Sequence, residues 1–134
     1  IYLAGPFFFL PQIKLRKEAL KALCKNYGFE GANPFSPAEN QYKGEPAAEK
    51  PQYIYENDLK GIEQADIVLA NVDPFEEDSG TAFELGYALA LGKPVYAFFK
   101  DKREYAERYR DGCMNEDFGK PLNLMIAGLS DNAR

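Results

Sequence analysis

The stretch that decides the fold is Asp73 to Val95, with the sequence DPFEEDSGTAFELGYALALGKPV. From Thr81 to Leu91 nearly every residue is small or apolar, which is typical of a helix buried on most of its surface. Asp78 and Ser79 are both favourable N-cap residues, and the glycine that follows Leu91 is a common helix end. The stretch therefore predicts one buried helix between two other elements of an α/β domain.

Glu84 is unexpected in this helix, because it lies between the apolar residues Phe83 and Leu85. Burying an ionised carboxylate without partners costs several kcal/mol, so we expect a wet pocket that opens onto Glu84. The positive end of the helix dipole is expected to keep the carboxylate ionised, as a nucleophile requires. A carboxylate that only faces a solvated groove would fit the spacing equally well.

Composition limits the possible partners. A chain of 134 residues with 46% hydrophobic residues fits a single globular domain over 1–134, and no apolar run approaches the roughly 20 residues of a membrane helix. The net charge of −5, without a basic stripe, argues against a polynucleotide and favours a small ligand. The chain begins at Ile1 without methionine, so we expect it to be trimmed or partial.

Residue usage also narrows the chemistry. The two cysteines, Cys24 and Cys113, follow no disulfide or metal pattern, which indicates a cytoplasmic protein, and we expect Cys24 in the core. The absence of histidine excludes Ser-His and Cys-His nucleophile pairs and imidazole zinc sites, so acid and base chemistry falls to carboxylates or tyrosine. GxGxxG and GxxxxGK motifs are also absent, and we expect no cofactor and no metal.

Strand and helix patterns alternate along the chain. We expect strands at residues 1–5, 66–71 and 95–99, a possible strand at 29–32, helices at 10–27, 53–64 and 100–110, and polar loops at 33–52 and 111–119. This alternation predicts an α/β fold with three layers, a doubly wound parallel sheet of the flavodoxin-like or Rossmann-like kind, with strand 66–71 in its centre. The 33–52 loop is long enough to form a lid or a base-binding wall.

In such a sheet, ligands bind beyond the carboxyl ends of the strands. This rule allows Tyr2 and Glu84 to meet, with Asp58 and Asp78 nearby. Acids without histidine fit cleavage of a glycosidic bond, in which Glu84 attacks the anomeric carbon and Asp78 protonates the leaving group. Structural roles compete with these functions: Asp78 can be a helix cap, Asp58 can lie on the solvated face of its helix, and Tyr2 can be a core aromatic residue.

Four segments together resemble nucleoside 2-deoxyribosyltransferases: IYLAGPFF at the start, NDLKGI at 57–62, DSGTAFELGYALALGKPV at 78–95 and GKPLNLM at 119–125. The resemblance implies exchange of a nucleobase on a 2-deoxyribonucleoside, through a covalent deoxyribosyl intermediate on Glu84. It implies that Asp78 and Asp58 hold the sugar and base and transfer protons, and that the hydroxyl of Tyr2 orients the nucleophile.

The resemblance also implies the substrate-binding residues and the assembly. Gln41 matches a residue that contacts the base, and we expect Gly5 and Phe7 at the rim to bind substrate. Asn123 matches an asparagine that reaches a neighbouring subunit's pocket in a hexamer built from dimers. Family members usually continue beyond the position of Arg134, with a terminal segment that helps to close the pocket.

Two other functions compete with this one. A related enzyme hydrolyses deoxynucleoside 5′-monophosphates and needs phosphate ligands. Here Phe7 to Phe9 and the acidic pair Glu76 and Glu77 make a free nucleoside the better fit. A nucleoside-binding module without catalysis is the second alternative, and the presence of Glu84, Asp78 and Tyr2 together speaks against it.

Overall fold

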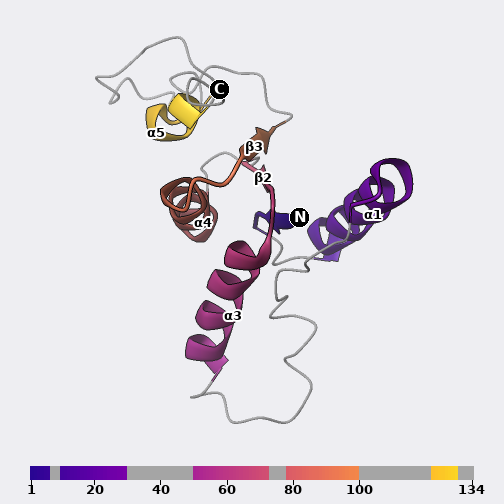
Figure 1. The fold of residues 1–134 in the computed structure, drawn as a ribbon, viewed down its shortest axis with the longest axis horizontal. Helices are drawn as coiled ribbons and strands as arrows, with labels where there is room; N and C mark the ends of the chain where they lie inside the picture. Colours follow the sequence, from indigo (N-terminus) through magenta and orange to yellow (C-terminus); the bar gives the residue numbers. More distant parts are fainter. Residues whose placement is uncertain (7–9, 30–49, 73–77, 100–121, 130–134) are drawn as a thin grey trace.

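The structure is a computed structural model that describes residues 1–6, 10–29, 50–72, 78–99 and 122–129. Its centre is a parallel sheet of three strands, β1 (Tyr2–Ala4), β2 (Val68–Asn71) and β3 (Val95–Phe98), in the order β1-β2-β3. Helices lie on both sides of this sheet (Figure 1). The predicted three-layer α/β fold is therefore confirmed, and β2 is the central strand of the three described ones.

Side chains alternate strictly between the two faces of the sheet. Ile1 and Leu3 belong to the hydrophobic cluster on one face, whereas Tyr2 and Ala4 belong to the cluster on the other face. The pairing of Tyr2 with Val68 fixes the register of β1 against β2, so these faces continue across the sheet. The alternation decides which helices each side chain of β1 can reach.

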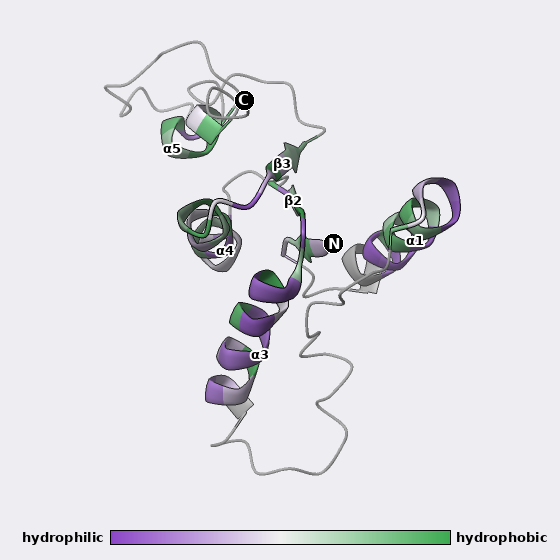
Figure 2. Cartoon of the chain, viewed as in Figure 1, coloured by the Kyte–Doolittle hydropathy of each residue, from purple (hydrophilic) through white to green (hydrophobic). Residues whose placement is uncertain are grey.

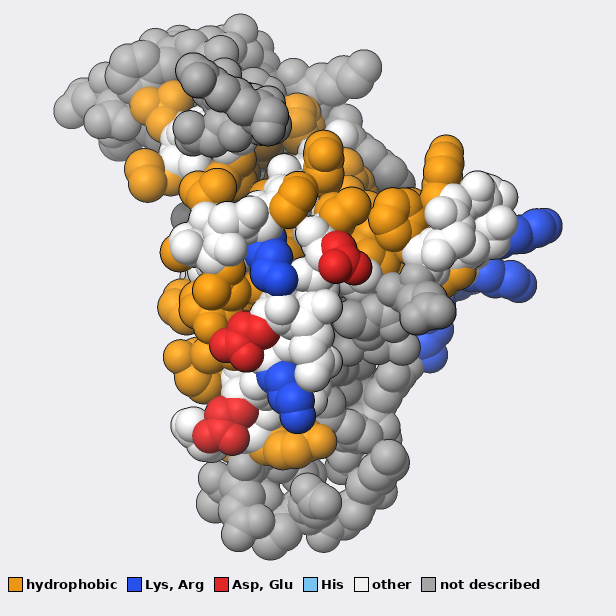
Figure 3. Space-filling view, viewed as in Figure 1, with side chains coloured by type: hydrophobic (Ala, Val, Ile, Leu, Met, Phe, Trp, Pro, Cys, Tyr) orange, Lys and Arg blue, Asp and Glu red, His pale blue; other side chains and the backbone are white. Residues whose placement is uncertain are grey.

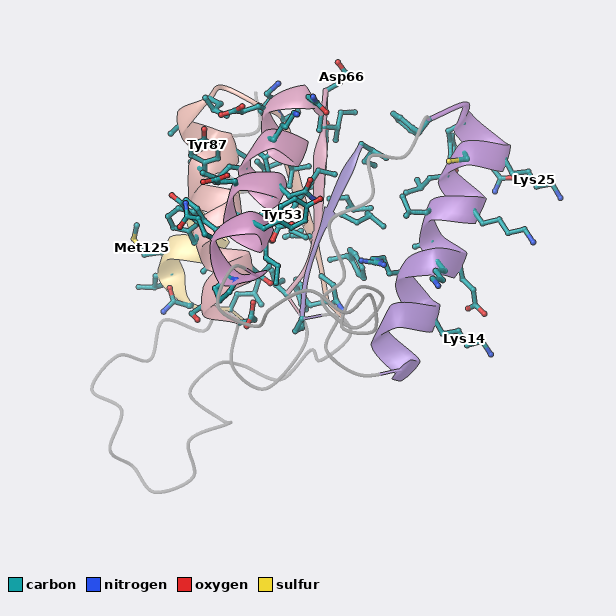
Figure 4. All side chains as sticks on the ribbon, turned by 90° about the horizontal axis from the view of Figure 1, so that it is seen from below. Lys14, Lys25, Tyr53, Asp66, Tyr87 and Met125 are labelled. Atoms are coloured by element: carbon teal, nitrogen blue, oxygen red, sulfur yellow. The ribbon has the colours of Figure 1, made fainter. Side chains whose placement is uncertain are left out.

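One face is covered by α1 (Leu10–Tyr27). Leu20 packs there with Ile1 and Leu3, and Lys14 and Lys25 point away from the sheet (Figure 4). Hydrophilic and hydrophobic segments alternate along α1, as expected for an amphipathic helix (Figure 2).

The prediction that Cys24 lies in the core is wrong, because its thiol is exposed. The buried side of α1 runs along Arg16, Leu20 and Leu23. Cys24 follows Leu23 by one position, and one position turns the side chain about 100° around a helix. That rotation carries Cys24 out of the packed stripe.

The other face is covered by α3 (Lys50–Gln64), α4 (Ser79–Ala90) and the short α5 (Leu124–Ala127). The buried core between these helices and the sheet consists of Tyr2, Ala4, Ile62, Ala65, Val68, Ala70, Val72, Leu85, Ala88, Leu122 and Ile126. The main core of the described residues is therefore on the side of the sheet from which Tyr2 projects. None of the described helices is long and apolar enough to cross a membrane.

Several predicted boundaries shift in the structure, and the strands predicted at 1–5 and 95–99 shorten to β1 and β3. The predicted helix 53–64 begins three residues earlier, at Lys50, because Pro51 lies in the first turn, where the absence of its N–H is tolerated. The predicted strand 66–71 begins at Val68. The predictions for residues 30–32 and 33–49, and for the helix at 100–110 and the loop at 111–119, lie outside the described residues.

Helices α3 and α4 are joined by polar contacts at one end. The hydroxyl of Tyr87 in α4 donates a hydrogen bond of 2.7 Å to Glu63 in α3. After α4, the ammonium group of Lys93 donates to the backbone carbonyls of Glu63 and Ala65, each at 2.8 Å. Lys93 thereby satisfies carbonyl groups at the carboxyl end of α3 that have no partner within the helix.

Candidate active site

The site is organised by a hydrogen bond between β1 and α4. The hydroxyl of Tyr2 donates to Oε1 of Glu84 over 2.6 Å, a length typical of a bond from a hydroxyl to a carboxylate. Tyr2 has no exposed surface, and Glu84, in the second turn of α4, is half-buried. The structure thus brings together the two residues that sequence reasoning expected to meet.

Burial changes the acidity of Glu84. Loss of solvent around the carboxylate raises its pKa from the ordinary value of 4.5 to about 7. The hydrogen bond from Tyr2 opposes this rise, whereas the charges of Asp58 and Asp78 add to it. The helix dipole is expected to help to keep Glu84 ionised, but this effect fades beyond the first turn, and desolvation raises the net pKa of the carboxyl group.

Tyr2 is a permanent hydrogen-bond donor at neutral pH. Burial raises the pKa of its phenol far above the ordinary value of 10, and the charges of Glu84 and Asp58 raise it further. Arg16 lowers it by a smaller amount. The phenol of Tyr2 therefore stays protonated near neutral pH and can donate its hydrogen bond to Glu84.

Asp58 lies beside this pair. It is half-buried, its Oδ1 is shielded from solvent, and its charge acts on both Tyr2 and Glu84. The alternative of a solvated helix face for Asp58 is therefore wrong. Asp58 lies four positions before the fully buried Ile62, so it is on the side of α3 that faces the core.

Asp78 is the N-cap residue of α4. Its Oδ2 accepts hydrogen bonds from the backbone N–H of Thr81 at 2.8 Å and from the Thr81 hydroxyl at 3.0 Å. Thr81 is itself buried. The cap predicted from the sequence is confirmed, and it holds Asp78 close enough for its charge to act on Glu84.

The predicted substrate-binding residues are only partly described. Gly5 follows β1 with a φ of 152°, a conformation that favours glycine, so the chain leaves the sheet there. Asn123 is the N-cap of α5, and its side chain accepts a hydrogen bond of 2.9 Å from the N–H of Met125. Gln41 and Phe7 lie outside the described residues, as does the 33–49 part of the expected lid.

Sequence reasoning missed Arg16 and Gly61. Arg16 is 2% exposed in α1, and its spacing to Leu20 and Leu23 already placed it on the packed side of the helix. Gly61 lies in the interior of α3 against the ring of Tyr2. The only signal for Gly61 was a glycine within a helical pattern, which usually has a packing or functional reason.

The described site therefore combines a carboxylate of raised pKa, a fixed phenolic donor and two further acids. A carboxylate that titrates near neutral pH can attack an electrophilic carbon once it is ionised. The neighbouring acids can hold hydroxyl groups of a sugar or transfer protons. The histidine-free sequence agrees with a site built from carboxylates and tyrosine.

Comparison with known proteins gives the family. A sequence profile described as nucleoside 2-deoxyribosyltransferase matches residues 1–125. The chain belongs to the nucleoside 2-deoxyribosyltransferase family. This membership confirms the resemblance found in the four sequence segments.

Members of the nucleoside 2-deoxyribosyltransferase family are among its relatives. The nucleoside deoxyribosyltransferase of Lactobacillus leichmannii is 40% identical, over 98% of this chain and 81% of that protein. The structure of a 2-desoxiribosyltransferase from Leishmania mexicana superimposes with a TM-score of 0.73 at 34% identity, covering 93% of this chain and 83% of that one. The 5-hydroxymethyl-dUMP N-hydrolase of Mus musculus is 34% identical, over 82% of this chain and 54% of that protein.

Proposed function

We propose that the chain is a nucleoside 2-deoxyribosyltransferase, which exchanges nucleobases on 2-deoxyribonucleosides with retention of configuration. The observation that carries this proposal is the 2.6 Å hydrogen bond from Tyr2 to Oε1 of Glu84. It fixes one carboxylate oxygen and leaves Oε2 as the atom for attack. Membership of the family supports the same reaction.

In the first half of the reaction, Oε2 of ionised Glu84 attacks the anomeric carbon of the 2-deoxyribose. The bond from that carbon to the base nitrogen breaks, and its electron pair leaves with the base. Asp78, protonated at the start of this step, gives its proton to the departing base and becomes a carboxylate, and the sugar remains as an ester on Glu84. The desolvation that raises the pKa of Glu84 also makes its anion a better nucleophile once formed.

In the second half, a nitrogen of the incoming base attacks the anomeric carbon of the ester. The bond to Oε2 breaks, the electron pair returns to Glu84, and Asp78 takes the proton from the incoming nitrogen. Two inversions at one carbon preserve the configuration. Asp58, whose charge acts on both Tyr2 and Glu84, holds a polar group of the bound nucleoside beside them.

Substrate binding extends beyond the acids. We assign base recognition to Gln41 and Phe7, and the entry to the site to Gly5, where the chain leaves β1. Asn123 supplies its amide to the pocket of a neighbouring subunit in a hexamer built from dimers. The exposed side chains of Leu124 and Met125, in the helix that Asn123 caps, support an assembly that covers them.

Hydrolysis is the second candidate, because water can replace the incoming base at the ester. The similarity to the mouse 5-hydroxymethyl-dUMP N-hydrolase supports hydrolysis as this second candidate. We propose hydrolysis of free nucleosides as a side activity of the enzyme. We propose nucleoside salvage in the cytoplasm as its cellular role. Transfer is the main activity because the chain covers 81% and 78% of two nucleoside deoxyribosyltransferases but only 54% of the mouse hydrolase.

The test is to incubate the protein with deoxyadenosine or thymidine and a panel of free bases. We expect new nucleosides, and a deoxyribosyl adduct located on Glu84 by mass spectrometry when no acceptor base is present. Glu84→Ala is expected to abolish both. Free deoxyribose as the sole product would favour the hydrolase. Transfer by Glu84→Ala at the rate of the unmodified protein would refute the covalent intermediate on Glu84.

A further inference from the structure

Helix α3 contains a glycine where helix stability alone would not place one. Gly61 lies three residues before the last residue of α3, Gln64. A glycine inside a helix is less favourable than alanine by about 1 kcal/mol. Gly86, in the interior of α4, has open space around the position of a missing Cβ, but Gly61 does not.

The space that a side chain at position 61 would need is filled by the ring of Tyr2. A Cβ at this position would lie 3.0 Å from Cε2 and 3.1 Å from Cδ2 of that ring. Cε2 is bonded to the carbon that carries the hydroxyl. The backbone of α3 is therefore in close contact with the edge of the ring that leads to the donor atom.

The Tyr2 ring has little freedom to avoid such a Cβ. Tyr2 has no exposed surface and packs in the core with Ile62 and Leu85. A Cβ at 3.0 Å would displace the ring by a few tenths of an ångström. A displacement of that size matters for a hydrogen bond of 2.6 Å, because the strength of such a bond falls with distance and misalignment.

We propose that Gly61 is a positioning residue of the active site: its missing side chain lets the Tyr2 ring lie against α3 at the depth that brings its hydroxyl to Glu84. Asp58 is one helical turn earlier, at the i−3 position, so the same side of α3 supplies both the clearance and a charge. The expected effect on kcat rests on the proposed transferase function. The effect of Gly61 on the position of the Tyr2 ring does not depend on that function.

The experiment compares Gly61→Ala with the unmodified protein by 13C NMR titration of the Glu84 carboxyl carbon, whose signal is identified by its loss in Glu84→Gln. The groups that act on Glu84 are Tyr2 from β1, Asp58 from α3 and Asp78 from the start of α4, and Arg16 from α1 acts on Tyr2. Because the hydrogen bond from Tyr2 lowers the pKa of Glu84, weakening it should move the midpoint upward from about 7.

We expect an upward shift of about 0.5 to 1 pH unit in Gly61→Ala. The kcat at pH 6 should fall about 3- to 10-fold, because the ionised fraction below the midpoint changes tenfold per unit. KM should change little, and kcat should recover above pH 8. Combined with Tyr2→Phe, which already removes the hydrogen bond, Gly61→Ala should produce no further shift.

The matched control is Gly86→Ala, which makes the same change in a helix interior without a neighbour within 4 Å. It should leave the midpoint unchanged. An unchanged midpoint and a full kcat at pH 6 in folded Gly61→Ala would overturn the proposal, and so would loss of the folded state, which would assign Gly61 to packing. If the unmodified protein formed no new nucleosides while Gly61→Ala moved the midpoint, the transferase function would fail and the positioning role would stand.

Discussion

Tyr2 and Glu84 are 82 positions apart in the sequence, and the phenolic oxygen of one lies 2.6 Å from a carboxylate oxygen of the other. The bond closes a contact between the first strand and α4 across the main core. It also opposes the two influences that hold the proton on Glu84, which are loss of solvent and the neighbouring acids. The balance leaves a carboxyl group with a pKa of about 7.

Removing the Tyr2 hydroxyl should make Glu84 harder to ionise. In Tyr2→Phe, the acidic limb of the kcat profile should move above pH 7, and kcat at pH 6 should fall about tenfold. The ring stays in place, so the fold should persist with a loss of about 1 kcal/mol in the free energy of unfolding. Tyr87→Phe is the matched control, because it also removes a hydroxyl bonded to a glutamate, but at an exposed position. An acidic limb that stays in place in Tyr2→Phe would contradict this account.

Glu84 should reduce stability as pH rises. Its pKa in the folded protein, about 7, is above the ordinary value of 4.5, so its contribution to stability is present below about pH 4.5 and is lost as pH rises through 7. The glutamine side chain of Glu84→Gln does not titrate. The difference in the free energy of unfolding, Glu84→Gln minus the unmodified protein, should therefore increase by up to about 3 kcal/mol between pH 4.5 and pH 8. Urea unfolding at several pH values measures this, with exposed Glu63→Gln as control. Parallel profiles for Glu84→Gln and the unmodified protein would show that the carboxylate is not destabilised.

The two roles of Asp78 should separate by substitution. Asparagine caps helices as well as aspartate does, so Asp78→Asn should keep the bond from the Thr81 N–H and unfold within about 0.5 kcal/mol of the unmodified protein. Asp78→Ala should lose about 1 kcal/mol. Both should lower kcat by about 100-fold or more if Asp78 transfers the proton. A fully active Asp78→Asn would leave Asp78 as a cap alone.

Two inactive variants should restore activity together if subunits share a site. Asn123→Asp keeps an N-cap for α5 but lacks the amide N–H₂, and Glu84→Gln lacks the nucleophile. When the two variants are dissociated, mixed and reassembled, each pocket draws position 84 from one subunit and position 123 from another. Four combinations arise in equal amounts, and one of them has both native groups, so we expect up to about a quarter of native activity. Each variant reassembled alone is the control. Absence of recovery from mixed oligomers would place Asn123 in its own subunit's site.

The sequence predicted the residues that meet, because the relevant signals were local. The apolar run at 66–71, the cap at Asp78 and the strand at the start each specify an element, and the topology of parallel sheets brings their carboxyl ends together. The pairing of Tyr2 with Glu84 could therefore be predicted from the sequence. The close approach of Gly61 to the Tyr2 ring had no such local signal, because it depends on the depth at which α3 packs.

The raised pKa of Glu84 was not predicted from the sequence, for a related reason. The helix dipole can be read from position along α4, whereas desolvation depends on what covers the carboxylate in three dimensions. Cys24 shows the same difference, since a shift of one position around α1 decided between core and solvent. Likewise, the predicted loop 33–52 reached into residues 50–52, which form the first turn of α3.

The space-filling view shows hydrophobic side chains along the flank formed by α4 and α5, away from α1 (Figure 3). Exposed side chains there include Phe83, Leu89, Leu124 and Met125. Phe83 in α4 stacks on Tyr87 with an interplanar angle of 3° and contacts Tyr55 in α3. These rings connect α3 and α4 on their outer side, where the hydrogen bond from Tyr87 to Glu63 also connects them. The pair of helices that carries Asp58 and Glu84 is thus joined on its outer side as well.

The alternation along β1 makes the length of this strand more important than its composition. Deleting one residue between Tyr2 and Gly5 would move Tyr2 one position closer to Gly5 along the chain. A slip of one position would turn an aliphatic side chain toward Glu84 and the aromatic ring toward α1. Variants made to improve the catalyst can therefore vary Ile1 and Leu3 among aliphatic residues. They must keep the residue count from the beginning of the strand to Gly5.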